Sequence, residues 1–346
     1  MKQQRVRVIS VLLMGVLILS VAFSANAQEQ KYRFLMISHI GSNDPNMLWL
    51  TFAIDEFERR FPEVDIEYIS TPNSTVEDLV RMTREALATN PDGIAIPIQS
   101  SEALDADLRA AIEAGIPVVA FNIPDTRPEG ERIPYLTYVG GDEYQTGVVL
   151  AGAILDAAAT GTIPAPTAAV CAIWDPGHQG LVARCAGFRD TLAAADIVSE
   201  DLDITQDPAM AVTTMQSYLT GHEDVNVIFA VTAGSGPWMY AAADELGLSP
   251  AVDGEGITMV GVDESPVSLE GVRQGFLLAT HSQGFYLQGF TPFEVLYWNL
   301  ELGSDPSYDV LSGPILIDSS NVEAWIPLTR NIFGDQYDTL SEGQWE

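Results

Sequence analysis

The chain has 346 residues, of which 47% are hydrophobic and 18% are charged, and this composition is typical of a globular protein with room for two domains. Its 48 acidic residues outnumber the 16 lysines and arginines, and the formal net charge of -32 excludes a nucleic-acid-binding role because phosphates would be repelled. Lysine occurs only at positions 2 and 31, and we interpret such an acidic, lysine-poor surface as a sign of a saline habitat.

The first 27 residues have the pattern of an export signal. A basic start, MKQQRVR, precedes the apolar stretch VISVLLMGVLILSVAF and the small residues of SANA, which predicts cleavage after Ala27. An uncleaved membrane anchor is the alternative, but the apolar stretch is short for a span of about 20 residues. We therefore expect an exported, periplasmic protein with a signal peptide over residues 1–27.

Beyond the signal peptide, predicted strands and helices alternate. Strands are expected at 32–40, 64–70, 92–100 and 116–122, with helices at 47–61, 75–89 and 101–115. A second series follows, with helices at 147–160, 181–195, 210–221 and 237–247 and strands at 168–174, 225–232 and 257–263. Continuous apolar strands separated by helices indicate an α/β fold with parallel sheets covered on both faces.

Two stretches of this pattern resemble each other. Residues 91–122 and 223–263 both contain a strand, a short polar loop, a helix that ends in glycine and a second strand, which is followed by Asn122 in one and Asp263 in the other. This weak duplication predicts two similar lobes. Because ligands of open α/β sheets bind at the carboxyl ends of the strands, the two tips are expected to face a cleft.

Few residues have the spacing of a reactive centre. Cys171 and Cys185 can pair in an oxidising compartment, and we favour a disulfide over two buried thiols. The four histidines and two cysteines give no metal-ligand spacing. The sequence contains no phosphate-binding, dinucleotide-binding or nucleophile-elbow motif, so we expect binding rather than catalysis and no cofactor or metal.

Six segments carry a family resemblance, in the order SHIGSNDPNMLW, IPVVAFN, YVGGDEYQTG, RCAGFRD, MVGVDESP and ATHSQGFYLQGF. In this order and spacing they resemble the type I periplasmic sugar-binding proteins, the group of the ribose- and galactose-binding proteins that serve ABC transporters. The resemblance covers nearly the whole mature chain.

The resemblance implies two Rossmann-like lobes joined by a three-strand hinge. The N-terminal lobe would comprise residues 31–138 and 284–312, and the C-terminal lobe residues 143–281 and 313–346. The crossovers would lie near 139–142, 282–284 and 312–316, and a sugar would be buried between the lobes.

The resemblance also implies a set of ligand-binding residues, namely Asp44, Trp49, Asn122, Arg184, Thr232, Asp263 and Gln283, with His39 and Trp174 as possible additions. Trp49 would stack on the apolar face of a sugar, although packing in a helix core is its alternative. Asn122 and Thr232 depart from the usual Asp and Asn, and Ile123 stands where an arginine is usual. Ligand identity therefore cannot be transferred from ribose binders.

We therefore expect an exported receptor that captures a monosaccharide or related polyol and presents it to the permease of an ABC transporter, and we expect a monomer. A hydrolase or isomerase acting on a small sugar is one alternative. A ligand-sensing module for a chemoreceptor or kinase is another, and the sequence does not separate it from a transport receptor.

Overall fold

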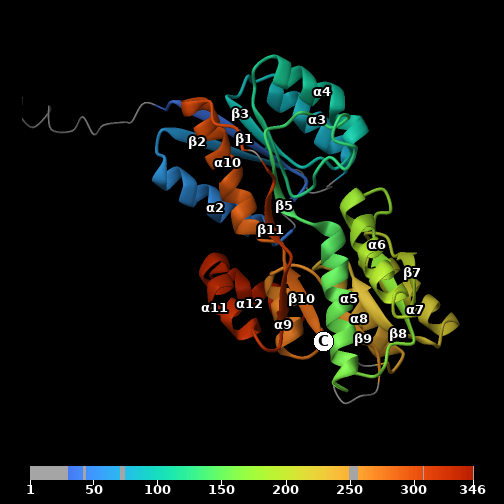
Figure 1. Ribbon diagram of the computed structural model, residues 1–346. Helices are drawn as coiled ribbons and strands as arrows, with labels where there is room; N and C mark the ends of the chain where they lie inside the picture. Colours follow the sequence, from blue (N-terminus) through green and yellow to red (C-terminus); the bar gives the residue numbers. More distant parts are fainter. Residues whose placement is uncertain (1–29, 42–43, 71–74, 249–255, 307, 346) are drawn as a thin grey trace, which may run out of the picture.

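The computed structural model describes residues 30–41, 44–70, 75–248, 256–306 and 308–345, so the predicted signal peptide and its cleavage after Ala27 lie outside the described residues. Two α/β lobes, each built on a six-stranded sheet, lie one above the other in Figure 1. Within the described ranges, no helix is both long and apolar enough to cross a membrane.

The N-terminal lobe is built on a fully parallel sheet in the order β11-β5-β4-β3-β1-β2. Its strands are β1 (Tyr32–Ser38), β2 (Val64–Ser70), β3 (Gly93–Ile96), β4 (Val118–Phe121), β5 (Tyr138–Gly141) and β11 (Val310–Gly313). Its helices are α2 (Met47–Arg60), α3 (Val76–Leu87), α4 (Ser101–Glu113) and α10 (Phe285–Leu302). Helices α2 and α10 cover one face of the sheet, and α3 and α4 cover the other.

The C-terminal lobe repeats this plan with the order β12-β10-β9-β8-β6-β7, in which only the described pair β10–β12 is antiparallel. Its strands are β6 (Ala168–Ile173), β7 (Val198–Asp203), β8 (Val225–Ala230), β9 (Thr258–Val260), β10 (Ala279–Ser282) and β12 (Ile315–Asp318). Its helices are α5 (Glu143–Ala159), α6 (Gln179–Ala193), α7 (Pro208–Gly221), α8 (Ser235–Glu245), α9 (Pro266–Arg273), α11 (Val322–Phe333) and α12 (Gln336–Ser341).

The helices begin where polar side chains can cap their free N–H groups. Thr75, Ser100 and Asp142 each accept a backbone N–H from the first turn of α3, α4 and α5. The expected helices and buried strands are present, and β3 and β4 are buried over their whole length. Strand β7 was not expected, because its sequence VSEDLD is acidic. It is a mostly exposed edge strand and pairs with β6, so only one neighbour restricts its composition.

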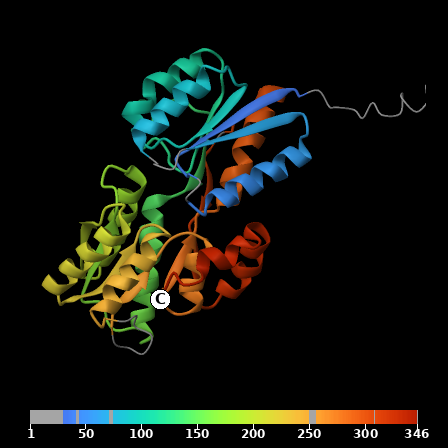
Figure 2. The ribbon, with the colours of Figure 1, turned by 180° about the vertical axis from the view of Figure 1, so that it is seen from behind.

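The chain passes between the two sheets three times, from β5 to α5, from β10 to α10 and from β11 to β12 (Figures 1 and 2). A further contact lies beside these passages, where Phe333 and Tyr337 of the C-terminal lobe join the buried cluster that includes residues of α2 and α10. The lobes therefore share a small apolar contact in addition to the connecting segments.

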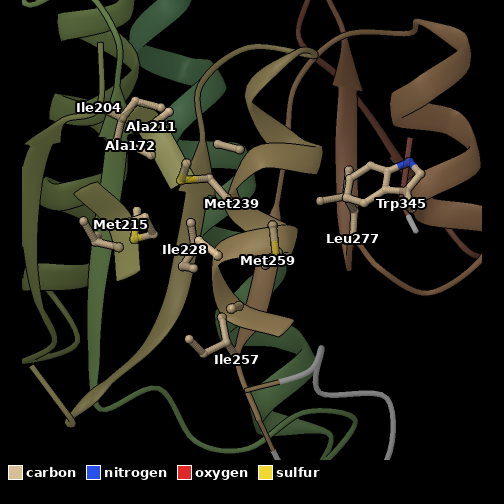
Figure 3. Packing of buried hydrophobic residues seen from close by; sticks show 14 of the residues in the cluster. Ala172, Ile204, Ala211, Met215, Ile228, Met239, Ile257, Met259, Leu277 and Trp345 are labelled. Carbon is tan, nitrogen blue, oxygen red and sulfur yellow. The ribbon is translucent and has the colours of Figure 1, made fainter. Parts of the chain in front are cut away.

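The core of the C-terminal lobe includes Met215, Met239 and Met259 between its sheet and helices (Figure 3). Trp345 covers the end of this core near α9, and its indole N–H donates to the backbone oxygen of Val267 at 3.0 Å. The penultimate residue is therefore part of the lobe's packing.

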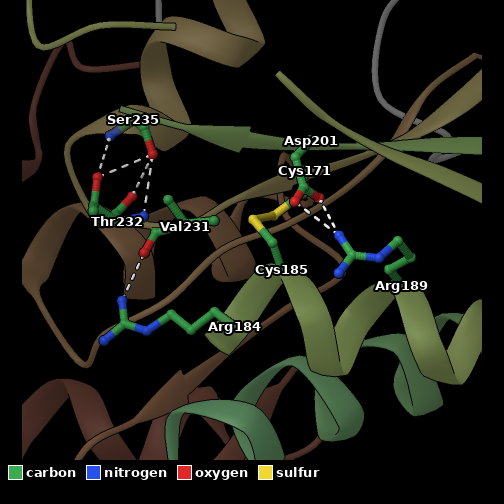
Figure 4. The surroundings of a disulfide bond; sticks show 8 residues. All are labelled: Cys171, Arg184, Cys185, Arg189, Asp201, Val231, Thr232 and Ser235. Atoms are coloured by element: carbon green, nitrogen blue, oxygen red, sulfur yellow. Dashed lines mark hydrogen bonds and ion pairs between the residues drawn. A yellow bond between two sulfur atoms is a disulfide. The ribbon is translucent and has the colours of Figure 1, made fainter. Parts of the chain in front are cut away.

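Two contacts fix helix α6 in this lobe. The structure contains a disulfide between Cys171 of β6 and Cys185 of α6, with the Cα atoms 5.7 Å apart (Figure 4). On another side, α6 packs closely on α5 at Gly187 and Gly147. A Cβ atom on Gly187 would lie 1.9 Å from the backbone oxygen of Tyr144, so only glycine permits this approach. Helix α6 is thereby held against both the sheet and α5.

Candidate ligand-binding site

A cavity of about 360 Å³ lies between the lobes and is lined by residues of both. Eight of the nine residues expected to bind or possibly bind a ligand line it, namely His39, Asp44, Asn122, Trp174, Arg184, Thr232, Asp263 and Gln283. Most of these side chains follow directly after a strand. His39, Trp174 and Gln283, for example, each come one residue after a strand ends. The cavity therefore forms where the carboxyl ends of the parallel strands of both sheets meet.

The two duplicated strand tips share an unusual backbone conformation. Asn122, just after β4, has a φ of 61°, and Asp263, after β9, has a φ of 74°. Both values lie in the left-handed region, which asparagine and aspartate tolerate better than most residues. This turn directs each polar side chain toward the cavity, and both residues are buried, with exposed fractions of 5%.

Gln283 connects the two tips. Its Oε1 accepts a hydrogen bond from Asn122 Nδ2 at 3.3 Å, and its Nε2 donates to Asp263 Oδ1. Asn122 Nδ2 also donates to Gln288 Oε1 of α10 at 3.0 Å. A continuous amide–carboxylate network thus connects lining residues of the cavity from one lobe to the other.

Asp44 and Asn46 bring the loop before α2 into this network. The backbone N–H of Asn46 donates to Asp44 Oδ1 at 2.8 Å, and its Nδ2 donates to Asp263 Oδ2 at 3.0 Å. Burial, followed by the charge of Asp263, raises the pKa of Asp44 to about 7. Asn46 was not expected from the sequence, because an asparagine before the first residue of a helix also fits an ordinary cap.

Arg184 of α6 is almost fully buried and has strong protein partners. It forms an ion pair with Glu143 at the start of α5. It also donates from Nη1 to the backbone oxygen of Val231 at 2.7 Å (Figure 4). Burial raises the pKa of Glu143, and the charge of Arg184 opposes this effect. Arg184 lines the cavity, but its charge is already paired inside the protein.

Trp49 does not line the cavity, and its expected stacking role is wrong. Its side chain is 2% exposed and packs edge-on against Phe333, with ring centroids 6.1 Å apart. It shares the buried face of α2 with Ala53, which lies one turn further along the helix. Helical periodicity therefore turns the indole into the core, as the alternative interpretation held.

The cavity obtains its aromatic surface from the other lobe. Trp174, after β6, and Trp238, in α8, both line it, with ring centroids 6.1 Å apart and an interplanar angle of 40°. Trp238 was not among the ligand-binding residues expected from the sequence. The available signal was its place in the first turn of a helix that follows a strand tip, since that turn faces the same edge as Thr232. The Thr232 hydroxyl itself donates to Ser235 Oγ at 3.0 Å.

Two histidines from opposite lobes meet at the cavity. The rings of His39 and His178 lie 5.7 Å apart, and His178 Nδ1 accepts the backbone N–H of Leu181 at 3.3 Å at the start of α6. Burial lowers the pKa of His39 to about 3 and that of His178 to about 4, so both rings are neutral at neutral pH. His178 had no sequence signal beyond its loop position.

Glu264 anchors the second passage between the lobes. It is 1% exposed, and its carboxylate oxygens accept the backbone N–H groups of Gln283 and Phe285, each at 3.0 Å. These two N–H groups lie at the start of α10, where a negative charge is favourable. Burial raises the pKa of Glu264 to about 7. The carboxylate next to Asp263 thus positions the residue that joins the two strand tips.

The cavity therefore combines carboxylate and amide groups with two indole faces and lies between two α/β lobes that are joined by three passages. Such an arrangement suits the capture of a small polar molecule with both hydrogen-bonding groups and apolar faces, and it defines a two-lobed binding protein. A family model described as a periplasmic binding protein domain matches residues 37–303. The chain belongs to this family.

Individual proteins are similar to this chain in sequence or in fold. The chain is 26% identical over 314 residues to the xylose/arabinose-binding protein XylF of Sulfolobus acidocaldarius, covering 88% of this chain and 75% of that protein. It is 28% identical over 222 residues to the ribose import binding protein RbsB of Bacillus subtilis, covering 62% of each. A carbohydrate transporter structure from Acidothermus cellulolyticus, solved with myo-inositol, has a TM-score of 0.73 at 21% identity and covers 87% of this chain and 99% of that one, which shows the common fold.

Proposed function

We propose that this protein is an exported receptor that captures a monosaccharide or related polyol between its lobes and delivers it to an ABC transporter. The observation that carries this proposal is the network of Asn122, Gln283 and Asp263, all three of which line the cavity. It places amide and carboxylate groups from both lobes within reach of one small ligand, so binding would favour the closed arrangement of the lobes.

The chemistry of the cavity matches that of a sugar. Hydroxyl groups need both donors and acceptors, which the amides of Asn122 and Gln283 and the carboxylate of Asp263 supply. The C–H faces of a sugar ring fit against indole surfaces such as those of Trp174 and Trp238. The names of XylF and RbsB refer to pentoses, which supports a ligand of this size and kind for the present chain.

The remaining parts of the proposal concern export and motion. Residues 1–27 would be removed after Ala27, and the mature monomer would present its closed form to the membrane permease. We place the lobes at 31–138 plus 284–312 and 143–281 plus 313–346, with closure by rotation about the three passages between them. The apolar contact of Trp49 with Phe333 would limit the range of this rotation.

A thermal-shift screen against pentoses, hexoses, deoxysugars and polyols tests this function. A ligand that binds only the folded state raises the free energy of unfolding, by about 2.7 kcal/mol when its concentration is a hundred times Kd. The melting temperature therefore rises with ligand concentration. Failure of the whole library to shift the melting temperature would contradict the proposal. Mass analysis of a bound sugar after long incubation addresses the hydrolase or isomerase alternative, because turnover would favour an enzyme.

A further inference from the structure

The charges around the cavity are unbalanced. Among the described residues that line it, three are carboxylates, at Asp44, Asp175 and Asp263, whereas Arg184 is the single guanidinium. Arg184 already forms an ion pair with the buried Glu143. The neutral side chains of His39 and His178 add no positive charge at neutral pH. A neutral ligand would supply no positive charge to offset these acidic groups.

Two of these carboxylates are held together by one asparagine. Asp44 comes from the N-terminal lobe and Asp263 from the C-terminal lobe, and Asn46 donates to both, at 2.8 Å and 3.0 Å. Their mutual repulsion is weakly screened because the site is largely buried, and it contributes to the raised pKa of Asp44. Asp175 is committed to its own turn, where it accepts the N–H of Gly177 at 2.9 Å.

A third acceptor lies between the two carboxylates. Asn46 is 3% exposed and lines the cavity, and its Oδ1 accepts no hydrogen bond from any described residue. A buried acceptor without a donor costs about 1–3 kcal/mol, so a donor from the ligand would stabilise the bound state. Asp44, Asn46 and Asp263 therefore present acceptors in one place, which suits a group with several donors.

The aromatic surface also favours a cation. Trp174 and Trp238 present indole rings to the same cavity, and the face of an indole attracts a positive charge within about 6 Å of its centre. An ammonium group has three N–H donors and a full positive charge, and it therefore matches the acceptors and the rings together.

We propose that the ligand is an amine-bearing sugar or polyol whose ammonium group binds among Asp44, Asn46 and Asp263. This inference rests on the proposed function and narrows its ligand class. The ammonium would neutralise the facing carboxylates of the two lobes and donate to the free acceptor of Asn46. It would therefore bind most tightly when the lobes are closed around it.

Isothermal titration calorimetry on the mature protein near neutral pH tests the proposal with matched ligand pairs. The pairs are 2-amino-2-deoxy-D-glucose with D-glucose, 2-amino-2-deoxy-D-galactose with D-galactose, and 1-amino-1-deoxy-D-glucitol with D-glucitol. The amine of at least one pair should bind about tenfold more tightly than its neutral partner or better, because charged hydrogen bonds are roughly twice as strong as neutral ones. The N-acetyl derivative, which has no charge, should lose this advantage.

Two variants assign the preference to the proposed residues. Asp44→Asn keeps the shape of the side chain and removes its charge, so it should abolish most of the amine preference, measured as the ratio of the Kd of the neutral sugar to that of its amine. Asp156→Asn, an exposed residue of α5 outside the cavity, should leave the preference intact. The melting temperature of each variant verifies that it is folded.

The possible results distinguish failure of the amine-ligand inference from failure of the proposed receptor function. Neutral sugars that bind as tightly as their amines, or more tightly, would overturn the inference and leave the sugar-receptor function standing. An amine preference that survives in both Asp44→Asn and Asp263→Asn would also overturn it. Absence of binding by both members of every pair, together with a silent neutral library, would overturn the proposed function itself and the inference with it.

Discussion

Asp263 combines two roles at the strand tip, because its oxygens accept hydrogen bonds from Asn46 and Gln283 and its side chain lines the cavity. Replacing it with alanine removes the acceptors and the charge. We therefore predict that Asp263→Ala weakens ligand binding by at least about 2 kcal/mol. Calorimetry with whichever ligand the screen identifies measures this loss.

Asp263→Asn separates backbone from side-chain effects in this experiment. Alanine is strained at a φ of 74°, whereas asparagine tolerates it. The asparagine variant should therefore keep the melting temperature of the parent and still lose affinity. Asp156→Ala, on the exposed face of α5, serves as the control and should bind normally. Unchanged affinity in Asp263→Ala would mean that this residue forms the turn but does not contact the ligand.

The raised pKa of Glu264 predicts that the free energy of unfolding depends on pH. Its pKa rises from 4.5 in the unfolded chain to about 7 in the folded protein, so its contribution is fully present below about pH 4.5 and is lost as the pH rises through 7. The loss should be roughly 3 kcal/mol, since each pKa unit corresponds to about 1.4 kcal/mol. Urea unfolding at pH 5 and pH 8 measures it.

The comparison variant for this measurement is Glu264→Gln, which stays uncharged across the range. Asp44 titrates in the same range and remains in both proteins, so the difference between the two proteins isolates Glu264. The unfolding free energy of the parent should fall relative to that of the variant between pH 5 and pH 8. Parallel curves would contradict the predicted ionisation.

Residues at strand tips were predictable from the sequence because an apolar run that ends in a polar residue marks the carboxyl edge of a parallel strand. Asn122 and Asp263 were found in this way, and both line the cavity. Trp49 was expected at the cavity but lies in the core, whereas Trp238 lines the cavity without having been expected there, and both lie in helices with a buried face. The sequence shows that such a residue is half or fully buried, but it does not show whether protein or ligand covers it.

At the level of elements, the contact between α5 and α6 positions Arg184 beside Glu143. We predict that Gly187→Ala destabilises the protein by more than about 2 kcal/mol, because its new Cβ would overlap the backbone oxygen of Tyr144 and force the helices apart. Ligand affinity should fall as well, since α6 carries Arg184. Chemical denaturation and calorimetry measure the two effects.

Gly152→Ala provides the matched control in the same helix pair. This residue lies within α5, and a Cβ there would meet no described atom within 4 Å. Its replacement should stabilise the protein by up to about 1 kcal/mol, because alanine favours helices more than glycine does. Equal effects of the two substitutions would show that close packing at Gly187 is unimportant.

Elements were predictable to the extent that their burial was regular. Fully buried strands such as β3 and β4 produce unbroken apolar runs, whereas the edge strand β7 alternates acidic residues with few apolar ones. Its pairing with β6 provides the hydrogen bonds that its composition does not suggest. A strand of this kind can be recognised only once its pairing with a neighbouring strand, here β6, is known.

For the whole molecule, the net charge of -32 predicts a marked response to salt. Repulsion among surface carboxylates destabilises the compact state, and salt reduces the screening length from about 10 Å at 0.1 M to about 3 Å at 1 M. We expect the melting temperature to rise when potassium chloride is increased over this range. A melting temperature that does not respond to salt would contradict both this expectation and the saline-habitat interpretation.

The overall architecture followed from the alternation of helices and strands, since parallel strands need crossover helices. The position of the cavity followed in turn from the carboxyl ends of those strands. The apolar contact of Phe333 and Tyr337 with the N-terminal lobe was not predictable, because nothing local in α11 or α12 distinguishes a residue that packs on its own lobe from one that packs on the other.

The order of segments along the chain has a consequence for how the protein is made. One face of the first sheet is covered by α2 and by Phe290, Phe293 and Leu296 of α10, which the ribosome adds only after the entire sequence from α5 to β10. A nascent chain that ends just after β5 therefore lacks the apolar side chains of α10 that cover this face of the sheet. We therefore expect the first lobe to complete its fold only after α10 has been synthesised.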